Sequence, residues 1–584
     1  MRFFKLAKER LRGISGAVVR FWTVFIMLCA AALFIGISIE NGGDYENLIL
    51  SLVFAAFVMF FAHTAAERFG KQFLTRVLIL TAGLLFSGGC YAWLTLGDPS
   101  DEVAYVTVFT LCFALLFAAM FVQAWQRETP FSAIFLNFFK SVYTSGFFSG
   151  VIFGGICIIL LTVDLLLFDI DGEIYAHLAN IVWVIWAPML MLSLLPKFAD
   201  RTEDRGKIER ATSYPRFFEI LLLYVLSPLA AAYTLVLVIY MVKTVATGSW
   251  EDNLLEPLIL IYLIALILLN VLLRGIDKPL SRVFRRITPG FIAAIAVFGM
   301  ASTIVTINRE GLVAGRYYIL LFGLYSVIVG LLMLLLSRRR YDYVAALAVA
   351  FALVCTLPGV GAYDVSAASK ARVITETLGK YGMLSDGKLI PGDKPSDADK
   401  RLIYDAVSYL DRTGRLDKLG FLPENFDVNS ANSFMKTFGF DPYGGSPDTE
   451  SRFRTFEVES GVIRTGGYDY MLKTNYFDGD ERIVGRVTHE GVEYTIKISK
   501  SNNKSVLSIK GDKDLLEFDL GVPFGIINGY DYDESYNLLS PDKLTFDAEN
   551  SSASLRVVFT RISLDDYGTG MYVEADMTIL FSIK

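Results

Sequence analysis

The sequence contains few of the residues that most often bind metals or form disulfides. Its 584 residues include three histidines, His63, His177 and His489, and five cysteines. All five cysteines lie in apolar runs before residue 356, so the C-terminal part has none. That part must fold without disulfides or thiolate metal sites, and three histidines supply no Cys/His zinc spacing. We therefore expect no metal site and no cofactor.

Motifs typical of soluble enzymes are also missing. No GxSxG occurs, and the stretches "GVPFGIINGY" and "SGGC" lack the strand, glycine-rich loop and helix order that a phosphate cradle needs. From Asp364 onward there are 36 acidic and 26 basic residues, whereas the preceding part has 24 acidic and 28 basic residues. An acidic C-terminal part, and basic loops held close to apolar runs, exclude nucleic acid as a partner.

Long apolar runs dominate the first 363 residues, in a chain that is 54% hydrophobic. About 20 apolar residues in a helix cross a hydrocarbon core of roughly 30 Å. Measured between flanking charges, the pattern predicts eleven transmembrane helices that together form a domain over residues 21–363, at 21–39, 48–66, 77–97, 103–126, 141–163, 174–196, 220–242, 257–273, 287–308, 317–337 and 343–363.

The charges of the loops between these runs predict the orientation of the chain. Loops on the N-terminal side hold 25 Lys and Arg residues, whereas the opposite loops hold three, Lys243, Arg309 and Arg316. Cationic loops stay in the cytoplasm. We therefore predict that residues 1–20 form a cytoplasmic basic N-terminus and not a removed signal peptide. An odd number of crossings then places the C-terminal part outside the cytoplasm, and the lipid bilayer is a partner.

Three consecutive arginines, Arg338, Arg339 and Arg340, separate the last two apolar runs. We interpret them as the last positively charged loop that stays in the cytoplasm, so that the following apolar run crosses the membrane outward. The alternative interpretation is a site for an anionic lipid or a phosphate.

The C-terminal part is predicted to have two regions. Residues 364–450 have the pattern of a helical extracytoplasmic connector, with Ser396 as the cap of its second helix and a one-sided apolar stripe. Residues 451–584 alternate as short strands, including a hairpin of "GVEYTIKIS" with "SVLSIK" and a closing pair of strands. This pattern predicts an α+β domain that ends in an antiparallel β-sandwich or an open barrel.

The tetrapeptide GYDY occurs twice in this β-rich part, at 467–470 and 529–532. Tyrosine rings on exposed loops can stack on sugar rings, and aspartates can accept hydrogen bonds from hydroxyl groups. A glycan or partner site is therefore one hypothesis for Tyr468, Asp469, Tyr530 and Asp531. The other is that Gly-Tyr-Asp suits the turn-to-strand junctions of two similar hairpins.

Ionisable residues near the bilayer gather between the fifth and sixth apolar runs, in "LLTVDLLLFDIDGEIYAHLAN". Charged groups at this depth are costly and are functional by default. A proton or cation site could be built from Asp164, Asp169, Asp171 and His177, because a nearby carboxylate raises the pKa of a histidine. A solvated acidic rim, with His177 packed at the membrane interface, is the alternative.

Three segments resemble one known family: "YPRFFEILLLYVLSPLAAAYTLVLVIYMVK" (214–243), "GRYYILLFGLYSVIVGLLMLLLSRR" (315–339) and "AYDVSAASKARVITETLGKYGMLSDGKLIP" (362–391). They are similar to the bacterial polytopic membrane family catalogued as domain of unknown function 4153. The resemblance covers most of the chain after about residue 130. It implies a multi-pass protein of the bacterial cytoplasmic (inner) membrane, and it supplies no active-site residues.

Three functional classes are compatible with these patterns. The favoured class anchors an extracytoplasmic domain that binds an envelope polymer or a membrane protein partner, because no catalytic motif is found. The alternative is a transporter that uses the cluster near Asp164, since Pro188 and Pro228 fall within apolar runs. The third is a lipid-linked glycosyl- or phosphotransferase with outward chemistry, although its first outer loop, "ENGGDYEN", is short.

Overall fold

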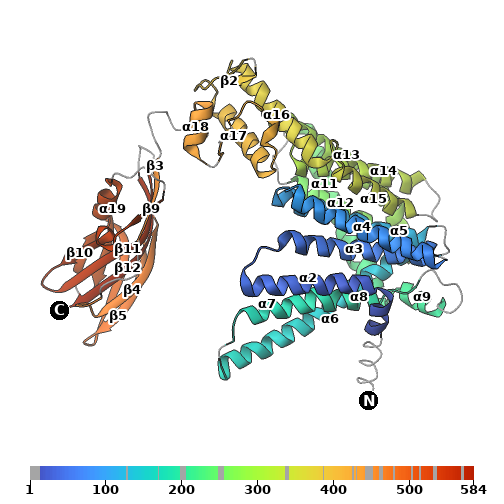
Figure 1. Ribbon diagram of the computed structural model, residues 1–584, viewed down its shortest axis with the longest axis horizontal. Coiled ribbons are helices and arrows are strands. Elements are labelled where there is room, and N and C mark those ends of the chain that lie inside the picture. The colour runs from blue at the N-terminus through green and yellow to red at the C-terminus, as the bar shows by residue number, and fades with distance from the viewer. Residues whose placement is uncertain are drawn as a thin grey trace. The chain divides into compact units, whose positions relative to one another are not determined.

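The structure, a computed structural model (Figure 1), describes most of the chain. The described residues are 13–70, 72–125, 129–168, 170–197, 205–247, 255–335, 341–385, 387–423, 426–428, 430–440, 452–458, 465–477, 481–501, 504–511, 514–530, 536–566 and 571–584.

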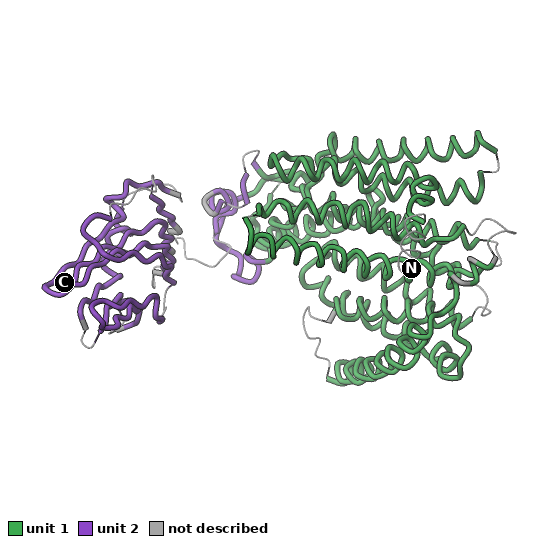
Figure 2. The backbone as a smooth tube through the Cα atoms, turned by 90° about the horizontal axis from the view of Figure 1, so that it is seen from below, with its two compact units in different colours: residues 1–389, 402–422 green, residues 390–401, 423–584 purple. Residues whose placement is uncertain are grey.

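The chain divides into two compact units (Figure 2). The membrane unit comprises residues 1–389 and 402–422, and the second unit comprises residues 390–401 and 423–584. The stretch predicted as a connector, residues 364–450, therefore contributes to both units.

Within the described residues of the membrane unit, ten helices are long and apolar enough to cross a bilayer. The chain is thus a multi-pass membrane protein, and these helices contact lipid. They are Trp22–Asn41 (α2), Glu46–Phe69 (α3), Phe73–Leu96 (α4), Asp101–Ala124 (α5), Phe131–Leu166 (α6), Glu173–Ser193 (α7, η1 and α8), Arg216–Thr247 (α10, η2 and α11), Glu256–Gly275 (most of α12, then η3), Pro279–Glu310 (α13) and Ala314–Leu335 (α14).

The eleventh predicted span is shorter than expected. The run at 343–363 forms α15, Asp342–Thr356, whose 15 residues extend only about 22 Å at ~1.5 Å per residue. The helix stops because Pro358 disfavours helical geometry at Leu357, which is extended. After a turn the chain starts a new helix, α16 (Ala362–Lys380). α15 packs along α5 inside the bundle.

Several helices are longer than the apolar runs that predicted them. The runs at 141–163, 220–242 and 287–308 lie in helical segments of 36, 32 and 32 residues. Main-chain hydrogen bonds form whether or not the side chains are apolar, so a helix can continue beyond the hydrocarbon into the charged flanks. The apolar run therefore measures the membrane thickness and not the helix length.

Two of the spanning helices contain a π-helical segment just before a proline. Ile181–Trp186 (η1) precedes Pro188, and Leu221–Leu226 (η2) precedes Pro228. Proline has no N–H and clashes with the carbonyl one turn earlier, so the helix widens there. The serine before Pro228 donates its hydroxyl to the carbonyl oxygen of Leu222 at 2.7 Å. Each helix therefore continues through its proline.

Helices α13 and α14 pack against each other over an extensive surface, and a glycine permits the close approach. A Cβ atom at Gly330 of α14 would lie 2.8 Å from the carbonyl oxygen of Pro289 and 3.2 Å from the amide nitrogen of Ala293. Small residues allow helix backbones in a membrane to approach in this way. Gly330 is therefore a packing requirement of the bundle.

The described residues of the second unit form two β-sheets. One has the strand order β4-β12-β11-β3-β9, with β10 paired to β11, and the other has the order β5-β6-β7-β8. The strands are Arg452–Val458 (β3), Tyr470–Phe477 (β4), Arg482–His489 (β5), Val492–Ser501 (β6), Lys504–Lys510 (β7), Asp514–Asp519 (β8), Tyr536–Leu539 (β9), Thr545–Glu549 (β10), Ala553–Asp566 (β11) and Met571–Ile583 (β12).

The predicted strand pairs are confirmed, with one difference. β6 and β7 form the expected antiparallel hairpin, and β11 and β12 form the closing pair. The prediction of an antiparallel architecture throughout is wrong at one edge, because β3 and β9 run parallel. A single hydrophobic core joins the two sheets, with Phe456 and Leu555 from one and Ile498 and Leu507 from the other. Both sheets therefore bury one face against this shared core.

The helix pairing predicts that Gly330→Ala destabilises the bundle. The added methyl group would force α13 and α14 apart, which we expect to cost about 1–3 kcal/mol, as overpacking does. The measurement is the thermal unfolding midpoint of the full-length protein in detergent.

The matched control is Gly315→Ala on the same helix, where an added Cβ meets nothing within 4 Å. We expect this variant to unfold at the wild-type temperature or slightly above it, because alanine favours helix more than glycine does. Equal midpoints for both variants would contradict the role assigned to Gly330.

Candidate functional site

The carboxylates of the predicted ion cluster close the turn between α6 and α7. Asp164 accepts a hydrogen bond from the amide of Ile170 at 2.6 Å, just as α6 ends. Asp171 accepts one from the amide of Glu173 at 3.1 Å, where α7 begins. Asp169 lies outside the described residues. Both described carboxylates thus have a local structural role, and an ion site here stays a prediction.

His177 is held by a different part of the bundle. Its Nε2 atom lies 3.7 Å from Oε1 of Glu40 at the end of α2, and its side chain is about one-third exposed. Asn180, one turn later, donates to the carbonyl oxygen of Ala32 at 2.7 Å, which pins α7 to α2. Among the described residues, Glu40 is the acidic group that contacts His177, whereas Asp164 contacts the amide of Ile170. Within the described ranges, no group of three His, Cys, Asp or Glu residues is arranged to hold a metal ion.

The first GYDY motif precedes β4, as a turn-to-strand junction should. Tyr468 donates its hydroxyl to Oδ1 of Asp547 at 3.5 Å, and the guanidinium of Arg556 lies 5.5 Å from its ring centroid. Two hydrogen bonds from Arg556 lower the pKa of the Asp547 carboxyl. Asp469 accepts a hydrogen bond from the hydroxyl of Ser582. The Asp547–Arg556 ion pair therefore holds the Tyr468 side chain in place on the β-rich part.

The second GYDY motif has a different setting. Gly529 ends the helix α19 (Gly521–Asn528), so the expectation of two similar hairpins is wrong. Tyr530 donates its hydroxyl to the carbonyl oxygen of Lys543 at 3.0 Å, and its own carbonyl accepts from Arg454 at 3.0 Å. The residue thus fastens the end of a helix to the core. Asp531 lies outside the described residues.

The three arginines between the last two apolar runs, Arg338, Arg339 and Arg340, also lie outside the described residues. Their topological role and the alternative phosphate site both stay predictions.

Polar side chains that the sequence patterns did not reveal are linked to one another at one end of the helix bundle. We call this end of the bundle the α16 end, because α16 and the second half of α17 (Asp397–Arg412) lie there, beside the start of α14, and we call the linked polar side chains the platform. The Tyr409 hydroxyl accepts from the amide of Ala314 at 2.9 Å and shares a hydrogen bond with Ser366 at 2.7 Å. Burial raises the pKa of Tyr409, which keeps the phenol neutral.

Buried charges strengthen this platform. Arg316 at the start of α14 lies 2.6 Å from Glu310 at the end of α13, and Glu256 of α12 lies 4.0 Å from the same guanidinium. Lys370 of α16, which is 5% exposed, donates to the carbonyl oxygen of Glu310 at 2.8 Å. Burial, followed by the positive charge of Arg316, lowers the pKa of Lys370. Four helices are therefore joined through one charged cluster.

Two further ion pairs hold α17 and the turn after it. Arg412 lies 2.8 Å from Glu102 at the start of α5, and Arg415 lies 2.9 Å from Asp364 at the start of α16. The stripe predicted for α17 also reaches the core, because Ile403, Ala406, Val407 and Leu410 are fully buried. The helix is thus fixed by apolar packing and by charge together.

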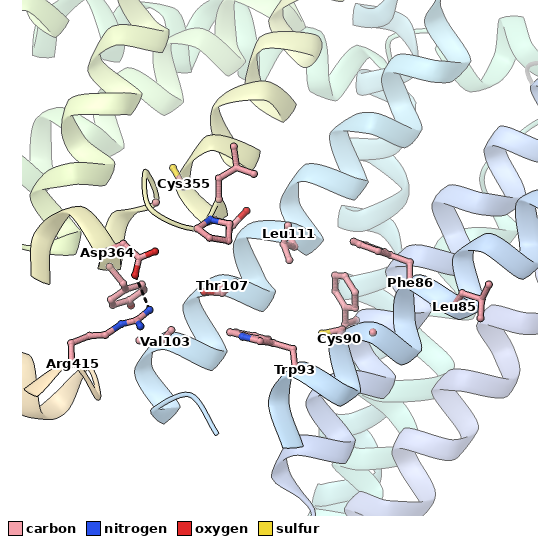
Figure 3. Close-up of a pocket in the computed structure, with 17 residues that line it drawn as sticks. Leu85, Phe86, Cys90, Trp93, Val103, Thr107, Leu111, Cys355, Asp364 and Arg415 are labelled. Atoms are coloured by element: carbon pink, nitrogen blue, oxygen red, sulfur yellow. Dashed lines mark ion pairs between the residues drawn. The ribbon is translucent and has the colours of Figure 1, made fainter. Parts of the chain in front are cut away.

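A groove opens beside this platform (Figure 3). It has a volume of about 510 Å³ and lies among α4, α5, the end of α15 and the start of α16. Phe86 and Leu111 line one part of it, while Asp364 and Arg415 stand at another part. We call it the α4–α5 groove. A second, larger cavity of about 680 Å³ lies among α5, α12, α14 and α15 and is lined mainly by aromatic and aliphatic side chains.

The platform predicts that Tyr409→Phe loosens the α16 end. Loss of the hydroxyl leaves the buried amide of Ala314 without its acceptor, at a cost of about 1–3 kcal/mol. Amide hydrogen exchange of the first turn of α14 should accelerate by about tenfold for each ~1.4 kcal/mol lost. As a control, Tyr91→Phe changes a tyrosine of α4 that is 43% exposed and should leave this exchange rate unchanged.

Comparison with known proteins returned one family. A family model described as Domain of unknown function (DUF4153) matches residues 24–386. No curated protein and no solved structure matches the chain. The matched range begins earlier than the resemblance at residue 130 suggested, and it ends before the β-rich part. Since the match covers more than half of the chain, the protein belongs to the DUF4153 family of membrane proteins.

Proposed function

We propose that this protein anchors its β-rich part, residues 451–584, outside the cytoplasm of a bacterial cell, where that part binds an envelope component or a partner protein. The membrane unit serves as the anchor in the cytoplasmic membrane. The observation that carries the proposal is the polar platform at the α16 end. There the chain leaving the last apolar helix is fastened to α5, α13 and α14 by hydrogen bonds and ion pairs.

These contacts favour a fixed attachment of the connecting helices α16 and α17 over a flexible linker. Lys370, Tyr409 and Arg412 each hold the connecting helices to a different spanning helix, through Glu310, Ala314 and Glu102. Interactions with buried groups resist local opening, because each opened group loses its partner in a low-dielectric setting. Because α16 and α17 are held in this way, the β-rich part that follows them is attached at a defined position on the membrane unit.

The distribution of cationic residues supports the proposed orientation. The 25 Lys and Arg residues on the N-terminal side of the crossings exceed the three on the other side. One of these three, Arg316, is also paired, with Glu310 and Glu256. The loops between the spans therefore place few cations on that side to hold it in the cytoplasm.

A transporter is the second candidate, and the two π-helical segments favour it. η1 and η2 precede Pro188 and Pro228 in two helices that follow one another in the chain. Such π-helical segments are frequent at functional sites. In this reading, the cluster around Asp164 and His177 would handle the coupling ion.

The orientation is tested with single-cysteine labels. Ser551→Cys adds a thiol at an exposed position in the turn between β10 and β11. A membrane-impermeant maleimide should label this variant in intact cells. The partner variant Gln72→Cys, at an exposed position between α3 and α4, should be labelled only after the cells are permeabilised.

Wild-type chain provides the background, because its five cysteines lie in the membrane helices. Labelling of Gln72→Cys alone in intact cells would reverse the proposed orientation.

The binding role is tested with full-length protein in lipid nanodiscs and purified peptidoglycan sacculi. Tyr468→Ala should lower the fraction of protein that pellets with sacculi, because it removes the aromatic ring beside Arg556. Tyr572→Ala, at a tyrosine of β12 that is 45% exposed, is the matched control and should pellet like wild type.

Wild type that stays in the supernatant would exclude sacculi as the envelope component. Equal pelleting of wild type and Tyr468→Ala would exclude this tyrosine as a contact.

A further inference from the structure

The α4–α5 groove has a floor, two walls and a charged end. Val103, Thr107 and Leu111 of α5 line it at four-residue spacing and extend over about 12 Å, at ~1.5 Å per residue. Phe86 and Trp93 of α4 stand on one side. The end of α15 and the turn after it stand on the other side (Figure 3). The groove is therefore a channel along a spanning helix and not a closed void.

Its side chains are accessible from the bilayer. Leu85 is 73% exposed and Phe86 is 54% exposed, in a helix whose surroundings are lipid. The backbone also leaves room, since a Cβ at Gly89 would meet nothing within 4 Å. Hydrocarbon is the medium around these residues, so an acyl chain is the natural occupant of the apolar part.

The charged end is built by the turn that ends α15. A Cβ at Gly361 would lie 2.6 Å from the carbonyl oxygen of Leu357, so only glycine lets the turn close this tightly. The closed turn brings the amide of Gly359 within 2.7 Å of Oδ2 of Asp364. The other carboxylate oxygen of Asp364 faces Arg415 at 2.9 Å. The turn therefore positions an aspartate–arginine pair where the groove meets the membrane surface.

Arg415 has donors to spare at this position. A guanidinium carries five N–H groups, and Asp364 is the ionic partner that the described part of the chain provides. The side chain is 36% exposed, so the remaining donors face the surroundings of the groove. Arginine binds phosphate groups strongly because its planar fork matches their oxygens. Trp93 lies beside the same end, as tryptophans do at the level of lipid headgroups.

We propose that the α4–α5 groove binds one glycerophospholipid of the leaflet at the α16 end. One acyl chain lies along α5 between α4 and α15, and the phosphate contacts Arg415. The site goes beyond the proposed anchoring function and does not depend on which side of the membrane the α16 end faces. A bound lipid here would contact α16 and α4 together, so it would add to the attachment of the platform.

In the part of the chain that the structure describes, the larger cavity on α5 has no feature that would select a phospholipid. None of the described residues that line it is charged, so these residues offer no partner to a lipid headgroup. Apolar chains of any lipid, or none, would fit it equally well. The charged end distinguishes the α4–α5 groove.

The chain contact is tested by filling the groove. Full-length protein is reconstituted in nanodiscs that contain a phosphatidylethanolamine with a photoactivatable diazirine in its acyl chain. After illumination, lipid attached to peptides from residues 85–93 and 103–111 is counted by mass spectrometry. Gly89→Leu should lower this attachment at least fivefold, whereas Gly88→Leu, whose Cβ also meets nothing within 4 Å but which does not line the groove, should match wild type.

The headgroup contact is tested by two variants that both break the ion pair. Arg415→Gln removes the cation, whereas Asp364→Asn keeps it and frees more of its donors. We expect attachment of phosphatidylethanolamine to fall severalfold in Arg415→Gln and to persist in Asp364→Asn. A diazirine-bearing diacylglycerol, which has no phosphate, should attach equally to both.

Two results would overturn the proposal. Wild-type attachment in Gly89→Leu would show that the chain does not occupy the groove. Equal loss of the phospholipid in Arg415→Gln and Asp364→Asn would show that the ion pair, and not a phosphate contact, sets the occupancy.

Discussion

Hydrocarbon offers no hydrogen-bond partner to a peptide group, and the whole membrane unit is built around that constraint. Each long crossing satisfies its main chain within its own helix. Prolines inside the crossings test the rule most severely, because each removes a donor. The chain responds with a π-helical segment before Pro188 and before Pro228, and a neighbouring serine hydroxyl satisfies a carbonyl oxygen of the second. Helical continuity therefore survives where the sequence alone indicated a break.

At the α16 end, beyond the apolar part of the helices, polar side chains cluster and supply one another with hydrogen-bond and ionic partners. Arg316, Glu256 and Lys370 are nearly withdrawn from solvent, yet each has a partner across a helix boundary. Buried charges are tolerated only when they are paired in this way. The same pairs connect the end of the membrane helices to α16 and α17. The membrane helices, α16 and residues 402–422 therefore belong to one compact unit.

The candidate sites differ in how well residue type predicted their geometry. Asp164 was singled out for its depth, but it closes a turn through Ile170. Tyr530 was paired with Tyr468 by a repeated tetrapeptide, but it supports the end of a helix, while Tyr468 stands beside Asp547 and Arg556. A short motif indicates a local backbone conformation, and the same local conformation can occur in different tertiary surroundings. The groove lined by Asp364 and Arg415 had no sequence signal, because its two charged residues are 51 positions apart.

The sequence by itself determined that the chain is a multi-pass membrane protein with an acidic, strand-rich end. Apolar runs and strand alternation are local patterns, and the medium that surrounds each segment dictates them. It also predicted the stripe of α17 and the pairing of β11 with β12, because amphipathic periodicity and short turns act over few residues. Only the tertiary structure decided the parallel β3–β9 edge, the Tyr409 platform and the groove. These features depend on which distant segments meet, and composition and periodicity carry no information about such meetings.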